Sequence, residues 1–251
     1  MRGKQQGRMI VAAVGLLALA ACGRSRNDSA VETSSAGGRS ASPSSADAAN
    51  RGVTMVRFVN VVPGAASAAL VSNDRALFQN VAYRNVTPYA EMDPNVTRLS
   101  LRLGGRDSTV AENREIVGDG AHYTVVAYAN DDGAPRLRVL RDELEPEPGK
   151  AKLRVIQAAP DLDKVQVVVQ GATEPIFSDI ELGREAGFIN VTPTRQPLVI
   201  RRDARSGPLL TITRLPLDSG HAYTVVLTRT PQNRLEAVTF EDALAGQHQQ
   251  H

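Results

Sequence analysis

The eight residues at 56–63, VRFVNVVP, decide the fold, because the same pattern recurs as LRVIQAAP at 153–160. In both copies a run of mainly apolar, often β-branched residues stops at a proline, which is typical of a short β-strand followed by a turn. The two copies lie 97 residues apart. A period of about 100 residues leaves room for a complete small domain in each copy.

Further matches extend the repeat over most of the chain. GAHYTVV at 120–126 returns as GHAYTVV at 220–226, Tyr89 matches Phe188 at an offset of 99, and Asp142 matches Asp242 at an offset of 100. The slowly growing offset indicates small loop insertions within one shared fold. The identical NVTP segments at 85–88 and 190–193 lie 105 residues apart. That offset conflicts with the matches on either side, so we interpret this identity as coincidence.

Each copy predicts strands and turns. The segment LSLRL at 99–103 alternates apolar and polar residues strictly, as a half-buried strand does. Clusters of Gly, Asn, Asp and Pro separate such runs. The strands expected in the first copy cover residues 55–62, 68–72, 77–81, 98–103, 123–129 and 136–140. Six or seven short strands in about 95 residues predict a small β-sandwich.

The predicted organisation is therefore all-β, with two tandem β-sandwich domains. The first covers residues 52–145 and the second covers residues 151–244. A proline-rich linker at 146–150 joins them, and residues 245–251 form a polar tail that we expect to be disordered. We expect each repeat to own a core, so that a cut at Pro148 would leave two halves that fold separately.

The N-terminal residues predict export. Residues 1–8 are polar and basic, and residues 9–21 form an apolar run too short to cross a bilayer, so residues 1–21 are interpreted as a signal peptide. LAAC at 19–22 resembles the bacterial lipobox, in which the cysteine carries the lipid. The alternative is an ordinary cleavage site that leaves Cys22 as a free thiol. Residues 22–51 are rich in Ser, Ala and Gly and predict a disordered tether.

Lipidation of Cys22 would make the membrane a partner and place the protein in the bacterial cell envelope. Gly23 stands where an Asp would resemble the inner-membrane retention signal, so the expected destination is the outer membrane. The 29 basic and 27 acidic residues become 26 and 27 once Arg2, Lys4 and Arg8 are removed with the signal peptide. A net charge of about −1 gives no reason to expect nucleic acid as a partner.

The chain shows no familiar motif of a catalytic or cofactor site, and we expect no catalytic residue and no cofactor. Its single Cys excludes disulfides. His122 and His221 belong to separate copies and are expected to be partly exposed residues at strand starts rather than metal ligands. Tyr123 and Tyr223 occupy the first inward position of a repeated strand and are expected in the core rather than in a glycan site.

Two acidic loops are weak candidates for binding. Asp131 and Asp132 precede Gly133, and Asp161 and Asp163 lie in the PDLD segment of the second copy. Carboxylate oxygens suit calcium, but the same residues also form ordinary turns. We favour the turn interpretation and expect no metal.

The strand-and-proline starts, the segment PDLDKVQVVV at 160–169 and the two GxxYTVV motifs together resemble the bacterial family 4397 of domains of unknown function. The resemblance spans about residues 53–244 and implies immunoglobulin-like or transthyretin-like sandwiches, found in tandem in secreted and envelope proteins. The first copy departs from the pattern, with PGAAS at 63–67 in place of PDLDK. No catalytic residue follows from the resemblance.

These observations favour a lipid-anchored, non-catalytic binding or assembly module that presents sandwich loops to an envelope protein or polysaccharide. One alternative is an envelope hydrolase that uses loop carboxylates such as Asp161 and Asp163. Another alternative is a purely structural stalk.

Overall fold

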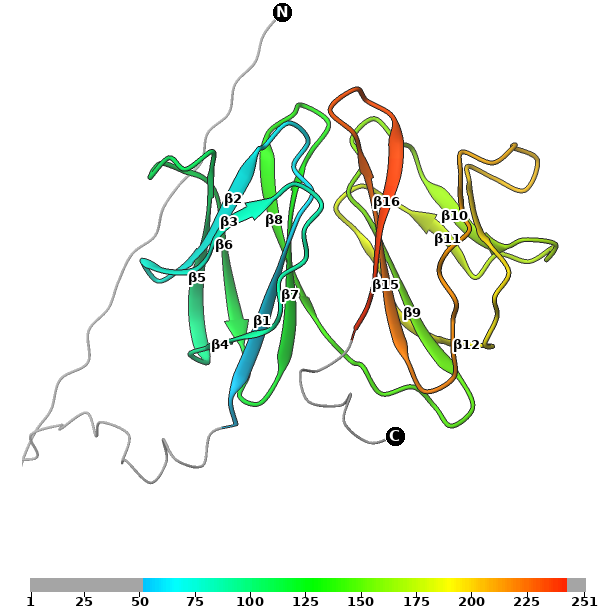
Figure 1. The fold of residues 1–251 in the computed structure, drawn as a ribbon, viewed down its shortest axis with the longest axis horizontal. Coiled ribbons are helices and arrows are strands. Elements are labelled where there is room, and N and C mark those ends of the chain that lie inside the picture. Colours follow the sequence, from blue (N-terminus) through cyan, green and yellow to red (C-terminus); the bar gives the residue numbers. More distant parts are fainter. Residues whose placement is uncertain (1–51, 243–251) are drawn as a thin grey trace, which may run out of the picture. The chain divides into compact units, whose positions relative to one another are not determined.

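The computed structural model describes residues 52–242, and all the regular secondary structure in that range consists of β-strands (Figure 1). The first repeat contains β1 (Thr54–Asn60), β2 (Ser67–Ser72), β3 (Arg75–Ala82), β4 (Ala90–Met92), β5 (Asn95–Leu103), β6 (Thr109–Val117), β7 (His122–Ala129) and β8 (Pro135–Arg141). The second contains β9 (Ala151–Gln157), β10 (Val165–Val169), β11 (Phe177–Ile180), β12 (Glu185–Val191), β13 (Leu198–Arg201), β14 (Leu210–Ile212), β15 (Ala222–Arg229) and β16 (Leu235–Glu241).

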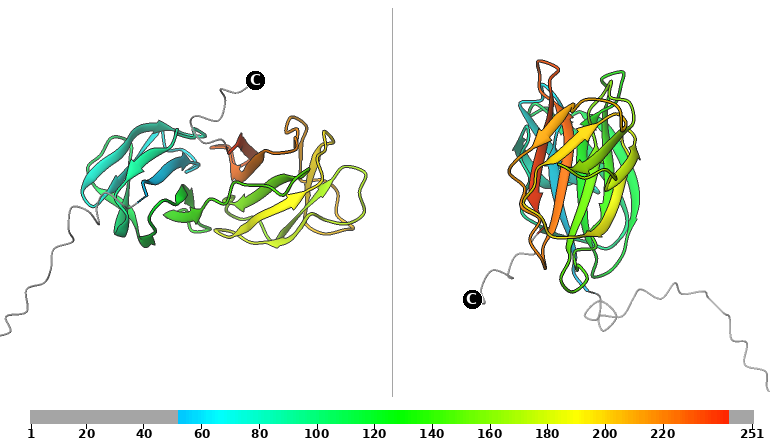
Figure 2. Two further views of the ribbon diagram at one scale, coloured as in Figure 1. Left: turned by 90° about the horizontal axis from the view of Figure 1, so that it is seen from below. Right: turned by 90° about the vertical axis from the view of Figure 1, so that its right-hand side faces the viewer.

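Each repeat is a sandwich of two four-stranded sheets (Figure 2). One sheet is antiparallel, in the order β3-β2-β5-β6 in the first repeat and β11-β10-β13-β14 in the second. The other is mixed, in the order β4-β1-β7-β8 and β12-β9-β15-β16, with a central parallel pair, β1 with β7 and β9 with β15. The predicted all-β fold and the two tandem sandwiches are confirmed.

The strand registers settle the alignment of the repeats. Thr54 pairs with Met92 in the first repeat, and Ala151 pairs with Val191 in the second. The edge strands β4 and β12 are thus related by an offset of 99. At the same offset, the carbonyls of Asn85 and Arg184 accept equivalent backbone bonds, from Asn60 and Gln157 respectively. The NVTP identity at offset 105 is therefore coincidental, as predicted.

Each sandwich encloses a core of its own. Val56, Phe58 and Val125 belong to the core of the first repeat, and their counterparts in β9 and β15 belong to the core of the second. Tyr123 is also buried there, and its hydroxyl accepts the backbone N–H of Gly118 at 2.9 Å. The other repeated tyrosine is placed in the same way, which confirms the core prediction for Tyr123 and Tyr223.

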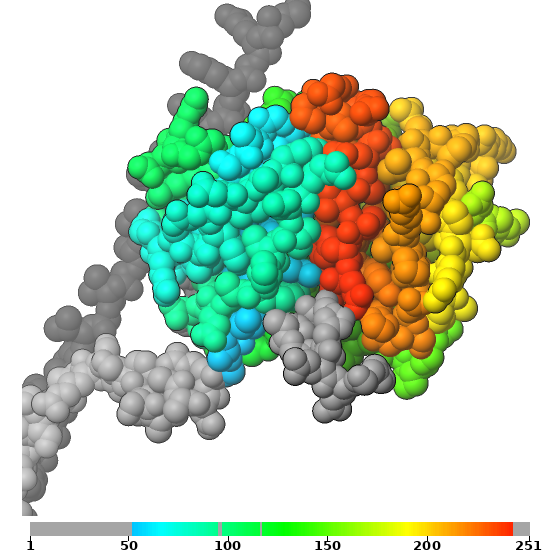
Figure 3. Space-filling view, in the orientation of Figure 1, coloured from blue at the N-terminus to red at the C-terminus, as the bar shows by residue number. Residues whose placement is uncertain are grey.

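A third apolar cluster is shared by the two repeats, and the sequence did not predict it. Side chains on the second face of both mixed sheets form it: Val59, Val61, Val126, Leu140, Ile156, Ala158, Val226 and Val238. The mixed sheets are therefore buried on both faces, which explains the almost continuous burial of β1, β7, β9 and β15. Atoms of the first repeat lie directly against β16 (Figure 3).

Two strands of the first repeat were missed because their sequences lack a clear apolar period. β6 reads TVAENREIV and β4 has three residues. The predicted signal peptide, Cys22, the tether and the tail at 245–251 all lie outside the described residues. Within residues 52–242, no helix has the length and apolarity needed to cross a membrane.

Candidate functional site

Four charged side chains are buried where the two repeats meet. Arg57 lies on β1 and Arg154 on β9, while Asp142 and Asp242 directly follow β8 and β16. Their exposed fractions are 3%, 0%, 8% and 5%. Burying an isolated charge destabilises a folded protein strongly. The contacts among these four side chains therefore determine whether the cluster stabilises the fold. We call Arg57, Arg154, Asp142 and Asp242, with Thr124 and Thr224, the junction cluster.

Arg57 connects the first repeat to the end of the second. Its Nε donates to Thr124 Oγ1 at 2.8 Å, and Thr124 Oγ1 donates in turn to Asp142 at 2.8 Å. Its Nη2 bonds to Asp242 Oδ1 and lies 4.0 Å from Asp142 Oδ2. One guanidinium therefore contacts both carboxylates of the cluster.

Arg154 makes the reciprocal contacts from the second repeat. Its Nε donates to Thr224 Oγ1 at 3.2 Å, and Thr224 Oγ1 donates to Asp242 Oδ2 at 2.7 Å. Its Nη1 lies 2.8 Å from Asp142 Oδ1, and its Nη2 lies 3.7 Å from Asp242 Oδ1. The two positive and two negative charges thus neutralise one another across the junction.

Aromatic rings cover this cluster. The Arg57 guanidinium lies 4.8 Å from the ring centre of Tyr89 and 4.6 Å from that of Phe240, and the Arg154 guanidinium lies 4.2 Å from that of Phe188. These distances allow cation–π attraction. The Tyr89 hydroxyl also donates to Asp142 Oδ2 at 2.7 Å.

The pKa values of two groups reflect this environment. Burial lowers the pKa of the Arg57 guanidinium from its ordinary value, although Tyr89 and Asp142 act in the opposite direction. Burial also raises the pKa of the Tyr89 phenol, and the nearby negative charge of Asp142 adds to that increase. The tyrosine therefore stays neutral and acts as a hydrogen-bond donor to the carboxylate.

The chemistry of the junction cluster is that of a structural clamp. Both threonine hydroxyls donate to carboxylates, and both carboxylates face guanidinium groups. No side chain of the cluster combines exposure to solvent with a free proton acceptor, which acid–base catalysis on a substrate would need. The cluster holds the two repeats to each other.

The structure brings the two acidic loops together. The backbone N–H of Asp161 donates to Asp131 Oδ1 at 2.8 Å, which joins the β7–β8 loop to the β9–β10 loop. Within the second repeat, Arg229 Nε donates to the carbonyl of Pro160 at 2.7 Å, which holds the β9–β10 loop in position. Asp131 and Asp161 therefore take part in a contact between the repeats.

The remaining two candidates have separate roles. Asp132 Oδ1 accepts the N–H of Ala134 at 2.7 Å, as in an ordinary Asx turn. Asp163 lies 3.6 Å from Arg202 in an exposed ion pair. Residues 52–242 contain no group of three or more His, Cys, Asp or Glu side chains arranged to hold a metal ion.

We expect metal removal to leave the protein's stability unchanged. Specific calcium binding at a hundred times its Kd would add about 2.7 kcal/mol to the free energy of unfolding, or roughly 5–10 °C in melting temperature. Thermal unfolding with EDTA and with millimolar calcium should instead give melting temperatures within about 1 °C of each other. A rise of several degrees with calcium would assign a metal site to the acidic loops.

The histidines lie on different strands and have different partners. His122 packs edge-on against Tyr89, with ring centres 5.4 Å apart. His221 Nδ1 lies 2.7 Å from Glu241 Oε1. They belong to separate repeats, and the structure does not bring them together in a shared ligand set.

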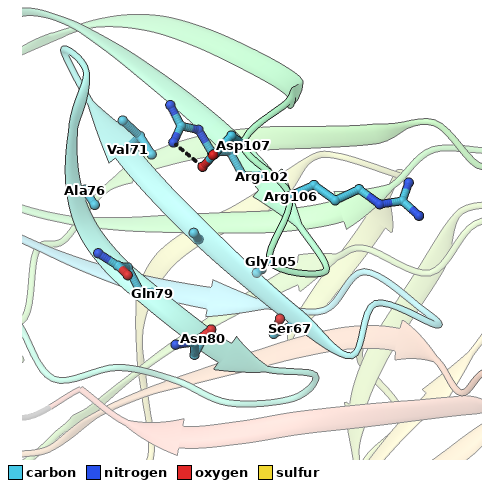
Figure 4. A pocket seen from close by; sticks show the side chains of 11 residues that line it. Ser67, Val71, Ala76, Gln79, Asn80, Arg102, Gly105, Arg106 and Asp107 are labelled. Atoms are coloured by element: carbon cyan, nitrogen blue, oxygen red, sulfur yellow. Dashed lines mark hydrogen bonds and ion pairs between the residues drawn. The ribbon is translucent and has the colours of Figure 1, made fainter.

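A small hollow lies on the antiparallel sheet of the first repeat (Figure 4). Its volume is about 230 Å³, less than the roughly 300–1,000 Å³ of most small-molecule sites. Gln79 and Asn80 border it from β3, and Arg102 bonds to Asp107 at 3.5 Å across the turn between β5 and β6. Arg106 points away from the other labelled side chains (Figure 4).

A larger hollow of about 790 Å³ lies at the edge of the same sandwich, where β1 begins. It contains three charged residues, Arg75, Glu91 and Asp93, all of them exposed. Asp161 and Asp163, the carboxylates suggested for a hydrolase, do not line this hollow.

Sequence reasoning singled out the acidic loops and missed the junction cluster. The signal was nevertheless present, because the matching strands carry the same polar residue types in both copies. Arg57 corresponds to Arg154, and Thr124 corresponds to Thr224. A charged residue that is repeated inside a buried strand indicates a shared structural role.

Comparison with known proteins agrees with this architecture. No curated protein matches the chain closely enough to count as a relative. The family model described as a domain of unknown function, DUF4397, matches residues 54–168 and again residues 151–250. The chain therefore belongs to the DUF4397 family and carries two tandem copies of its domain.

Proposed function

We propose that this protein is a lipid-anchored bacterial envelope protein that acts as a non-catalytic binding or assembly module. The observation that supports this most strongly is the junction cluster, which joins two sandwiches into one body. A fixed arrangement of two sandwiches presents loops from both repeats as a single surface, and binding surfaces are commonly built from loops on such rigid scaffolds.

The acidic loops are the best candidates for that surface. Asp132 and Asp163 are exposed, and the bond between Asp161 and Asp131 holds their two loops side by side. An ordered loop pair loses less conformational entropy on binding than two free loops would. The proposed ligand is an envelope protein or polysaccharide.

The proposed location depends on Cys22. LAAC at 19–22 resembles a lipobox, and residues 22–51 would separate the sandwiches from the lipid. The acyl chains would hold the protein on the membrane, and we propose the outer membrane as its destination.

The alternative of an envelope hydrolase has one feature in its favour, the 790 Å³ hollow with Glu91 and Asp93. It requires a carboxylate that acts on a bound substrate. A purely structural stalk would need no ligand at all.

The proposal is tested with the soluble fragment 52–251 as bait against an envelope extract and against purified cell-wall polysaccharide. We expect a component that the wild-type bait retains and that the double variant Asp132→Asn/Asp163→Asn loses. These changes remove two charges and keep side chains that can still form turns.

The matched control is Asp107→Asn/Asp119→Asn, which removes two exposed charges elsewhere in the first repeat. Equal retention by all three baits would contradict binding through the acidic loops. Turnover of a cell-wall substrate that is lost in Glu91→Gln/Asp93→Asn would replace the proposal with the hydrolase alternative.

A further inference from the structure

The contacts between the two repeats obey an internal twofold rule. Arg57 bonds to Thr124 of its own repeat and to Asp242 of the other. The residues equivalent to these, one repeat further along the chain, make the equivalent contacts: Arg154 bonds to Thr224 of its own repeat and pairs with Asp142 of the other. Reciprocal contacts of this kind define an isologous interface, in which the same surface patch meets its own copy.

Most of the apolar part of the junction follows the same rule. Four pairs of equivalent residues contribute to it, on or directly after matching strands: Val59 with Ile156, Val61 with Ala158, Val126 with Val226, and Leu140 with the partly buried Phe240. Val238 is the exception, because the equivalent residue of the first repeat is Arg138. Each repeat therefore contributes a similar apolar patch beside a similar Arg, Thr and Asp set. We call this patch, with its charged residues, the junction face of a repeat.

We propose that the junction face is a self-complementary docking surface whose partner is a second copy of the same repeat type. In the intact chain the neighbouring repeat occupies it. This inference is independent of the lipid anchor and of the ligand of the acidic loops.

The charges support pairing of a repeat with its own copy. In a pair of two second repeats, Arg154 of each would face Asp242 of the other. In a pair of two first repeats, Arg57 of each would face Asp142 of the other. Both arrangements keep the two guanidinium groups of the junction cluster against two carboxylates, so neither leaves a charge of that cluster unpaired.

Other contacts favour the pair formed within one chain. Tyr83 of the first repeat lies with its hydroxyl 2.7 Å from Glu236 Oε1, and Thr228 Oγ1 donates to the carbonyl of Val61 at 3.1 Å. The residues equivalent to Tyr83 and Thr228 are Leu182 and Tyr128, which differ in chemistry. The bond between Tyr83 and Glu236 therefore forms only in the mixed pair, because the residue equivalent to Glu236 in the first repeat is Arg136. The bond from Thr228 is absent from a pair of two first repeats.

The test uses the full chain with a protease site inserted between Pro148 and Gly149, both of which are exposed in the linker. The folded protein is cleaved, and native mass spectrometry at about 10 µM measures which repeats remain associated. We expect the cleaved halves to stay together at the mass of the uncleaved protein. Separation into single repeats would overturn the proposal.

A second arm tests self-complementarity. Isotopically labelled and unlabelled cleaved protein are mixed at high concentration and followed until they exchange. We expect labelled and unlabelled halves to recombine, with a minor population of pairs made of two first repeats or two second repeats. Recombination that yields mixed pairs alone would show a heterologous surface and overturn the isologous assignment.

Matched variants locate the surface. Val126→Asp and Val226→Asp change equivalent, fully buried positions of the two junction faces, and each should weaken association of the cleaved halves at least about thirtyfold. Val110→Asp, on the exposed side of the first repeat, should leave association unchanged. A strong effect of one junction variant with none of the other would contradict the twofold rule.

Discussion

Replacing Asp142 with alanine should lower the free energy of unfolding by about 3–5 kcal/mol. The change leaves Arg154 and Arg57, both buried, with one carboxylate in place of two, and it removes the acceptor of the Tyr89 and Thr124 hydroxyls. For a folded region of about 190 residues, this loss corresponds to a fall of roughly 10 °C in melting temperature. Urea denaturation and thermal unfolding, followed by circular dichroism, measure both quantities.

Asp107→Ala is the matched control. It also removes an aspartate that pairs with an arginine, Arg102, but its side chain is fully exposed. Exposed ion pairs contribute about 0–1 kcal/mol, so this variant should unfold almost like the wild type. If Asp142→Ala were as mild as its control, the junction cluster would not be holding the repeats together.

The double variant Arg154→Met/Asp142→Leu removes both partners of one buried ion pair. Comparing it with Asp142→Ala distinguishes the stability lost by leaving Arg154 without Asp142 from the stability that the ion pair itself contributes. Apolar residues of similar volume often replace a buried ion pair at little cost. We therefore expect the double variant to recover part of the stability that Asp142→Ala loses, even though it carries more changes.

Replacing Cys22 with serine should abolish acylation and the firm attachment of the protein to membranes. The serine cannot form the thioether, whereas wild-type protein should resist washes with salt and with alkali because acyl burial does not depend on ionic strength. Palmitate labelling and membrane fractionation measure the effect. The folded repeats should be unaffected, since the described residues 52–242 form the sandwich cores without it.

Ser25→Ala is the control for this experiment, because it changes a nearby polar residue and keeps Cys22. It should be labelled and fractionate like the wild type. Labelling that persists in Cys22→Ser, or wild-type protein that is wholly soluble, would contradict the lipoprotein proposal.

Much of the fold could be predicted from the sequence, because strands follow local rules. Alternation at 99–103 and the run of β-branched residues at 123–129 indicated β5 and β7 directly, and the repeat offsets fixed the two-domain plan. β6 was not predicted because its charged residues obscure the alternation of apolar and polar side chains. β4 was not predicted because three residues are too few to show an alternation.

The junction could not be derived from the sequence by the same rules. In a strand with one buried face, Arg57 would mark the solvent side, opposite Val56 and Phe58, so the start of the pattern VRFVNV was consistent with an ordinary sandwich. The side of β1 that carries Arg57 is covered by the mixed sheet of the other repeat. The local alternation of apolar and polar residues does not indicate which surface covers it. The acidic loops were chosen for their chemistry, and Asp131 and Asp161 proved to touch each other across the junction.

The central claim is that the junction cluster couples the two repeats, each with a core of its own, so that in the intact chain they unfold together. Calorimetry of the 52–251 fragment tests it most directly. We expect wild-type protein to unfold in one transition, with calorimetric and van't Hoff enthalpies that agree at about 130 kcal/mol. In Asp142→Ala the transition should move down by roughly 10 °C. Two separate wild-type transitions of about half that enthalpy each would show independent repeats and contradict the claim.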